Sequence, residues 1–278
     1  MTSNCQVFVN SSQSLETERV LVIPDAQVGF KDNKPTHSRL GFEAAVYLAS
    51  EYNKIVLLGD MLDLPALGKY KHGNDLRGKT SKAVRELRYW LERLVDANPD
   101  ADIHYIFGNH EERLRTLFKT YCPDLEDLFS LEEALGLDDL GITAHAPYGV
   151  DYRYKGVIYT HGHLHAKEGG LTATKYLNEY NTNVVYGHCH KRALTYKTDT
   201  HGNERWAMSP GMICAKGGVV PGSSRYSNWQ EGLGEVVYHK GRKPQASLIP
   251  IQGNNLFYEG TCLTIKHDHN ARQKELGF

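Results

Sequence analysis

The sequence predicts an α/β protein, because short apolar strands alternate with helical segments through its first half. The β-branched and apolar runs are short and bounded by turn residues, which is typical of buried parallel strands. They lie at residues 19–23, 55–58 and 103–107. Apolar residues with helical spacing fall between them. These segments predict helices at about residues 39–51 and 81–97.

After about Thr143 the pattern changes from helices to hairpins. A Lys155-Gly156 turn separates two short strand-like runs, and a helix is expected over about residues 171–180 before an apolar strand at 184–186. Residues 192–265 contain short strands broken by glycine-rich turns. We expect them to form an antiparallel second sheet.

Length and composition indicate one domain without a membrane partner. An α/β chain of 278 residues can form one unit, and we expect a flexible leader at 1–18 and a single domain at 19–278. The net charge of -1 gives no global field for nucleic acid or an anionic membrane. Five cysteines without C-x-x-C spacing predict a reducing compartment rather than a disulfide framework. No apolar stretch approaches a membrane span of ~18 residues, so a cytoplasmic protein is expected.

Polar side chains follow each predicted strand from the first to the one at 184–186. Because ligands bind beyond the carboxyl ends of the strands in α/β sheets, we expect these side chains to converge. They are carboxylates, amides and imidazoles: Asp25, Gln27, Asp60, Asn109, His161, His188 and His190. As single residues Asp25, Asp60 and Asn109 could be ordinary turn residues. Five such groups, each directly after a predicted strand, favour a ligand-binding site.

This mixture of oxygen and imidazole donors predicts a metal site. It contains no thiolate, so it suits Mn, Fe, Zn or Ni better than calcium or an iron-sulfur cluster, and Mg is a further candidate. Seven donors are too many for one tetrahedral zinc. They suit two divalent ions that share Asp60 as a bridge. We expect Mn first.

Five motifs occur in order between Val20 and His190: D-x-(H/Q), G-D-x-x-D, G-N-H-E, H-G and G-H-x-H. This series resembles the calcineurin-like metallophosphoesterases. Residues 209–211 and 227–232 are similar to versions of the family carried by bacteriophages, which would place the protein in the host cytoplasm. The resemblance implies a two-sheet β-sandwich flanked by helices, of the αββα type. It also implies two-metal-dependent hydrolysis of phosphoesters.

The resemblance implies a role for each motif residue. The first metal would be held by Asp25, Gln27, Asp60 and His190. The second would be held by Asp60, Asn109, His161 and His188, with His163 as an alternative to His161. His110 would be the catalytic histidine that protonates the leaving oxygen. Asp63 would be its hydrogen-bond partner.

Two departures from the family pattern bear on function. Gln27 stands where the family usually has histidine, and a neutral amide is a poorer donor for a transition metal. The first metal site is therefore expected to be weaker. Protein Ser/Thr phosphatases of the family have arginines where this chain has Leu64 and Phe107. A protein phosphatase is therefore disfavoured.

Basic side chains near these motifs predict a phosphodiester substrate, such as DNA, RNA or a nucleotide. The candidate substrate-binding residues are Lys69, Lys71, His72, Arg77, Arg113 and Arg192, with Lys79 and Lys191 beside them. Aromatic residues could stack a base, although scattered aromatics more often pack in the protein: Tyr70, Tyr148, Tyr226 and Trp229. Lysine-rich loops are also common without a ligand.

The alternatives to a phosphodiesterase are a phosphomonoesterase of broad or protein substrate and a catalytically weak scaffold. The sequence gives no signal for the oligomeric state.

Overall fold

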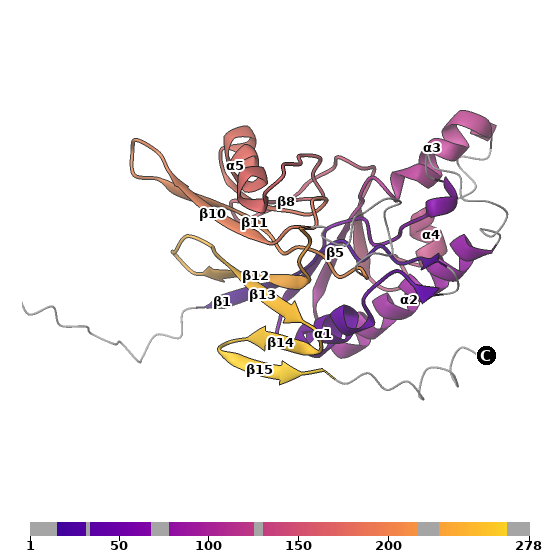
Figure 1. Ribbon diagram of the computed structural model, residues 1–278, viewed down its shortest axis with the longest axis horizontal. Helices are drawn as coiled ribbons and strands as arrows, with labels where there is room; N and C mark the ends of the chain where they lie inside the picture. Colours follow the sequence, from indigo (N-terminus) through magenta and orange to yellow (C-terminus); the bar gives the residue numbers. More distant parts are fainter. Residues whose placement is uncertain (1–15, 32–33, 68–77, 125–129, 216–227, 266–278) are drawn as a thin grey trace, which may run out of the picture.

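The computed structural model describes residues 16–31, 34–67, 78–124, 130–215 and 228–265. Two β-sheets pack face to face, and helices cover the outer face of each (Figure 1). The α/β class is therefore confirmed. The first strand begins at Thr17, slightly before the predicted end of the leader, and residues 1–15 lie outside the described chain.

The larger sheet has eight strands in the order β15-β14-β13-β12-β1-β4-β5-β6. Its parallel part contains the three apolar runs predicted from the sequence: β1 (Thr17–Ile23), β4 (Lys54–Leu57) and β5 (Asp102–Ile106), followed by β6 (Ile142–His145). An antiparallel part continues from β1 through β12 (Gly232–His239), β13 (Gln245–Gln252), β14 (Asn255–Tyr258) and β15 (Thr261–Thr264).

The smaller sheet has five strands in the order β10-β11-β9-β8-β7. The predicted hairpin is formed by β7 (Tyr152–Tyr154) and β8 (Val157–Thr160). The sheet is completed by β9 (Asn183–Tyr186), β10 (Ala193–Thr198) and β11 (Glu204–Ser209). A separate short hairpin consists of β2 (Phe30–Lys31) and β3 (Lys34–Pro35).

The described helices are α1 (Arg39–Ala49), η1 (Pro65–Leu67), α2 (Lys79–Ala97), α3 (Glu112–Tyr121), α4 (Leu131–Leu135) and α5 (Gly169–Tyr180). Two of them, α1 and α4, begin at a serine that caps their first amides. The Ser38 hydroxyl accepts a hydrogen bond from the Gly41 amide at 3.0 Å at the start of α1. The Ser130 hydroxyl accepts from the Glu133 amide at 3.0 Å in the same way at the start of α4.

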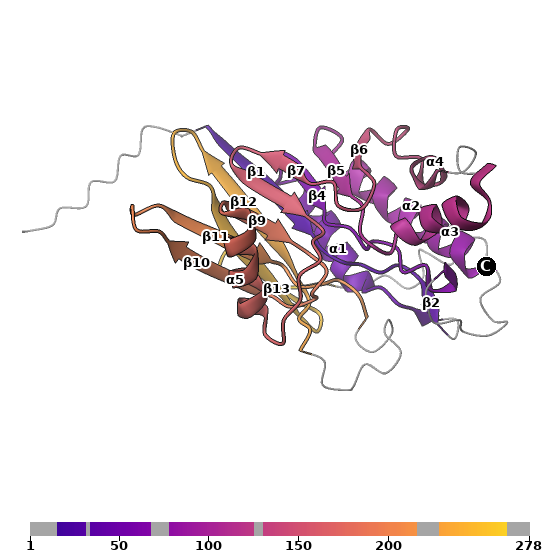
Figure 2. The same cartoon turned by 90° about the horizontal axis from the view of Figure 1, so that it is seen from above.

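Three apolar layers hold the elements together. One lies between the larger sheet and helices α1, α2 and α4, where Phe42 stacks on Trp90 with ring centroids 4.8 Å apart. A second lies between the sheets and includes Val56 and Val185. A third lies between the smaller sheet and α5. Figure 2 shows α5 over β9–β11, on the side away from α1 and α2.

The prediction of one antiparallel sheet from residues 192–265 is wrong. Strands β10 and β11 join the smaller sheet, where β11 runs parallel to β9, whereas β12–β15 extend the larger sheet from β1. Strands pair through backbone hydrogen bonds, which are the same for every strand. An alternating pattern therefore predicts that a segment is a strand but does not predict which strand it pairs with. Across the described ranges no helix has the length and apolar character needed to cross a membrane.

Candidate functional site

The predicted ligands lie in the loops that follow five strands, three in the larger sheet and two in the smaller. Asp25 and Gln27 follow β1, Asp60 follows β4 and Asn109 follows β5, all in the larger sheet. His161 follows β8, and His188 and His190 follow β9, both in the smaller sheet. The carboxyl ends of these strands meet at one end of the sandwich. The site is therefore assembled from both sheets.

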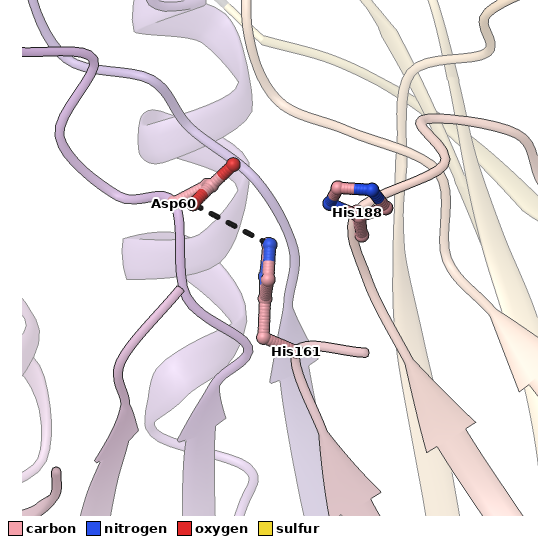
Figure 3. A group of neighbouring side chains, drawn as sticks. All are labelled: Asp60, His161 and His188. Carbon is pink, nitrogen blue, oxygen red and sulfur yellow. Dashed lines mark ion pairs between the residues drawn. The ribbon is translucent and has the colours of Figure 1, made fainter. Parts of the chain in front are cut away.

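Asp60, His161 and His188 form a compact cluster. Their potential ligand atoms all lie within 4.8 Å of one another. The Asp60 carboxylate points toward the His161 ring, with His188 facing the same space (Figure 3); Asp60 Oδ1 lies 3.4 Å from His161 Nε2. Asn109 Oδ1 completes the group, at 3.2 Å from His161 Nε2 and 2.9 Å from His188 Nδ1. This group could hold one divalent cation.

A second group forms around His190. Its Nε2 atom lies 3.3 Å from Asp25 Oδ1 and 3.2 Å from the amide nitrogen of Gln27. The Gln27 amide oxygen is buried without a hydrogen-bond partner among the described residues. Rotating this amide by a half-turn would direct its oxygen toward His190 Nε2. The group therefore offers two oxygen donors and one imidazole.

The two groups are joined through the loop that carries His188. Its backbone amide donates to both carboxylate oxygens of Asp25, at 3.0 and 3.1 Å. Gly187, the preceding residue, lies so close to this carboxylate that an added Cβ would be 2.7 Å from Asp25 Oδ2. Gly108 is packed in the same way, because a Cβ there would overlap the Asp60 carboxylate. Both glycines are required by close approach of the backbone.

Left-handed backbone conformations concentrate at this site. Eight described residues other than glycine have positive φ, and half of them belong to the predicted ligand set: Gln27, Asp60, His188 and His190. This conformation is unfavourable for residues with a Cβ and is often retained where a side chain must be aimed at a functional site. The backbone is thus strained at the same residues that the motifs select.

The buried site has an excess of carboxylates. Asp25, Asp60, Asp63 and Glu111 are all buried. Burial alone would lower the pKa of His161, but the neighbouring carboxylates, chiefly Asp60, raise it to about 10. His188 has a pKa lowered to about 4 by burial and by the neighbouring His161. Positive charge is therefore favoured beside Asp60.

His110 lies beside this cluster in an orientation that suits proton transfer. Its Nδ1 atom is 3.1 Å from Asp63 Oδ1, and its Nε2 atom is 3.6 Å from Asp60 Oδ2. Its backbone amide donates to Asp60 Oδ1 at 2.8 Å. Burial lowers the pKa of His110, but the carboxylates of Asp60 and Asp63 outweigh it and raise the pKa above its ordinary value. Asp63 thus contacts the ring at ion-pair distance, although this Nδ1 atom has no hydrogen bond among the described residues.

Glu111 is a site residue to which sequence reasoning gave no role. Its Oε2 atom accepts hydrogen bonds from the backbone amides of Asp60 and Gly108, each at 2.9 Å. Its Oε1 atom accepts from the Leu62 amide and the Tyr105 hydroxyl, also at 2.9 Å. Its place in G-N-H-E was visible, but the amides of Asp60 and Leu62 belong to the loop after β4, which only the fold brings next to it.

The neighbouring histidines and cysteine lie outside the cluster. The side chain of His163 is 57% exposed and lies 3.8 Å from Glu179, so His161 is the histidine that faces Asp60. His165 lies 3.1 Å from the ammonium of Lys191. Cys189, between two predicted ligands, is buried on the α5 side of the smaller sheet.

The structure places two of the candidate substrate-binding cations next to the site. Arg113 Nη1 donates to the Asp63 carbonyl oxygen at 2.5 Å, and Arg192 Nη1 donates to the Glu231 carbonyl oxygen at 3.2 Å. Both guanidinium groups are therefore anchored to the chain. Lys69, Lys71, His72 and Arg77, together with Tyr70 and Tyr226, lie outside the described residues. Two aromatic rings flank the histidines: Trp229 beside His190 and Tyr148 beside His161.

The chain is similar in sequence to two bacteriophage proteins whose names state no activity. No family model matches the chain. The Gene 54 protein of Mycobacterium phage D29 is 25% identical over 265 residues, covering 88% of this chain and 98% of the phage protein. The Gene 54 protein of Mycobacterium phage L5 is 23% identical over 267 residues, with 88% and 98% covered. The phage part of the resemblance is thus supported.

Among solved structures, the chain is similar to a hypothetical protein from Thermus thermophilus. The two share 14% sequence identity, and the match covers 82% of this chain and 98% of that one, with a TM-score of 0.37.

Proposed function

We propose that this chain is a phosphoesterase that depends on two divalent cations and resembles the calcineurin-like metallophosphoesterases. The proposal depends on one observation: oxygen and imidazole donors from five strand ends gather in two adjoining groups. The two-sheet sandwich with outer helices is compatible with the fold that the motif series implies. The phage relatives fit the likeness to phage-encoded versions of the family.

The donor sets fit a pair of cations. Asp60, Asn109, His161 and His188 would hold one, and Asp25, Gln27 and His190 would hold the other together with Asp60. The excess of buried carboxylate and the unpartnered Gln27 oxygen both favour positive charge here. Mn²⁺ suits this mixture of amide, carboxylate and imidazole donors. When bound, two such cations supply Lewis-acid charge and an activated water to a phosphoester.

His110 supplies the proton for the leaving oxygen in this proposal. Its Nε2 atom is on the side of Asp60, whereas Nδ1 faces Asp63, so Nε2 is the atom directed at a substrate. The raised pKa keeps this imidazole protonated nearer to neutral pH than an ordinary histidine. Asp63 fixes the orientation of the ring and stabilises its charged form.

The substrate class that we propose is a phosphodiester of DNA, RNA or a nucleotide. Arg113 and Arg192 lie beside the site and can add positive charge along a phosphate backbone. Leu64 and Phe107 are buried apolar side chains at the positions where protein phosphatases have arginines. Neither position can bind the phosphate of a phosphoprotein through a charged group.

Metal-dependent hydrolysis of two model esters tests this proposal. The purified chain is dialysed against a chelator, supplied with Mn²⁺ and assayed on bis-p-nitrophenyl phosphate and p-nitrophenyl phosphate. Faster turnover of the diester is expected, and Asp60→Asn should abolish it. Faster turnover of the monoester would indicate a phosphomonoesterase instead. If Mn²⁺, Fe²⁺, Zn²⁺, Ni²⁺ and Mg²⁺ all gave no hydrolysis of either ester, the chain would be better described as a scaffold.

A further inference from the structure

His190 differs from His161 in how its ring is held. The Nδ1 atom of His161 lies 2.8 Å from the Leu58 carbonyl oxygen, which leaves Nε2 to face Asp60. Metal-binding histidines usually have such a partner on the second ring nitrogen. The buried Nδ1 atom of His190 has no hydrogen-bond partner in the part of the chain that the structure describes. Another contact must therefore orient this imidazole.

Trp229 provides that contact. Its ring meets the His190 ring with centroids 4.5 Å apart and an interplanar angle of 72°, an edge-to-face arrangement. His190 itself is 4% exposed. Its Nε2 atom faces Asp25 and Gln27. The indole packs against the ring and opposes its rotation away from these two donors.

The residue after Trp229 holds the backbone of the same loop. The Gln230 amide donates to the His190 carbonyl oxygen at 3.1 Å, and its side-chain oxygen accepts from the Arg192 amide at 3.0 Å. The Gln230 side-chain nitrogen donates to Asn228 Oδ1 at 2.7 Å. Gln230 thus clamps the loop on both sides of Lys191. This matters because His190 has a φ of 57°, a conformation that relaxes easily unless it is held.

We propose that Trp229 and Gln230 are positioning residues that aim His190 at the cation held with Asp25 and Gln27. The inference rests on the proposed function. It adds a segment immediately before β12, far along the chain from the five motifs, to the determinants of metal affinity. This group is the one with the weaker amide donor, Gln27, so its affinity depends most on the remaining imidazole.

Calorimetric titration of the metal-free full-length chain with Mn²⁺ alone tests this inference. Trp229→Leu should weaken one of two binding events about tenfold or more, whereas Trp229→Phe, which keeps a flat ring, should bind nearly as the wild type. Gln230→Ala should weaken the same event. Tyr196→Leu is the control, because this aromatic ring is exposed on β10, outside the site. It should leave both events unchanged.

The His190→Ala background separates positioning from a general structural effect. If Trp229 acts through His190, Trp229→Leu adds no further loss of affinity once His190 is removed. An equal loss in both backgrounds would overturn the inference. So would wild-type affinities in Trp229→Leu and Gln230→Ala, although the proposed function would stand. Absence of Mn²⁺ binding by the wild type would instead contradict the proposed function.

Folding of each variant is checked by circular dichroism before titration. Should Trp229→Leu not fold, Trp229→Met keeps apolar volume at the same position without a ring edge. It is expected to show the same loss at one binding event. Wild-type binding by a folded Trp229→Met variant would also overturn the inference.

Discussion

The Glu111 carboxylate accepts a hydrogen bond from the backbone amide of Asp60 at 2.9 Å. The two residues follow neighbouring parallel strands, β4 and β5. The same carboxylate receives the amides of Leu62 and Gly108. Glu111 therefore fixes the left-handed turn at Asp60 from the adjacent loop, without itself facing the metal donors.

Replacing Glu111 should reduce the free energy of unfolding. In Glu111→Gln the side chain keeps its size, but an NH₂ group replaces one acceptor and leaves buried amides unpaired. We expect a loss of about 3 kcal/mol, measured by urea denaturation. Glu112→Gln is the control, because this neighbouring carboxylate is half-buried and its hydrogen bond to the Tyr148 amide is long, at 3.4 Å. Equal stability of the two variants would contradict the role of Glu111.

His110→Ala should separate turnover from metal binding. Removal of the proton donor is expected to lower kcat on bis-p-nitrophenyl phosphate by about 10²- to 10⁴-fold. The Mn²⁺ content after dialysis should match the wild type, because His110 is not among the predicted ligands. Asp63→Asn should give an intermediate loss, since it leaves the imidazole in place. Unchanged turnover in His110→Ala would remove this residue from the proposed mechanism.

Gly108→Ala should disturb the site through steric overlap alone. The new methyl group would meet the Asp60 carboxylate and displace it. We expect weaker Mn²⁺ binding and a loss of stability of about 1–3 kcal/mol. Gly170→Ala in α5 is the matched control, since its Cβ would find only Thr195 Oγ1 at 3.8 Å. The control should bind Mn²⁺ normally and be slightly more stable, because alanine favours the helix.

The histidine pair His104 and His145 should contribute a loss of stability as the pH is lowered from 7.5 to 5. His104 Nδ1 lies 3.0 Å from His145 Nε2, next to Asp102 and Lys54. Burial lowers the pKa of both imidazoles below 6.5. Below pH 6.5 the unfolded chain therefore binds protons that the folded chain does not, and the folded state loses stability until the folded pKa values are passed.

The contribution of this pair is measured as a difference between variants. Urea midpoints at pH 7.5 and 5 are compared for the wild type and His145→Gln in metal-free buffer. On going from pH 7.5 to 5, the urea midpoint of the variant should change less unfavourably than that of the wild type, because one of the two titrating rings is absent. A decrease of equal size in both proteins would exclude the pair as a source of the pH dependence.

The convergence of the candidate donors could be predicted from the sequence because it depends only on which residues directly follow each strand. Each apolar run ends in a polar residue, and parallel strands must align their carboxyl ends. The loops that carry Asp25 and Asp60 could therefore be expected at the same edge of the sheet. The same local reasoning could not assign β12 to β1, because strand pairing depends on backbone groups that every residue shares.

The supporting residues were less visible than the donors. Glu111 was one acid in a motif, and its four hydrogen-bond donors come from the loops after β4 and β5 and from β5 itself. Trp229 was one aromatic residue among several, with nothing in its spacing to connect it to His190. Such roles depend on contacts between distant segments, which composition and periodicity do not encode.

The donors of each predicted cation come from both sheets, since Asp60 follows β4 and His161 follows β8. An ion coordinated by both residues would cross-link the two sheets. Sliding one layer over the other would break its coordination, so mechanical cohesion of the sandwich would be linked to its occupancy. Removal of the ions by a chelator would then weaken the packing of the two sheets against each other as well as remove the metal.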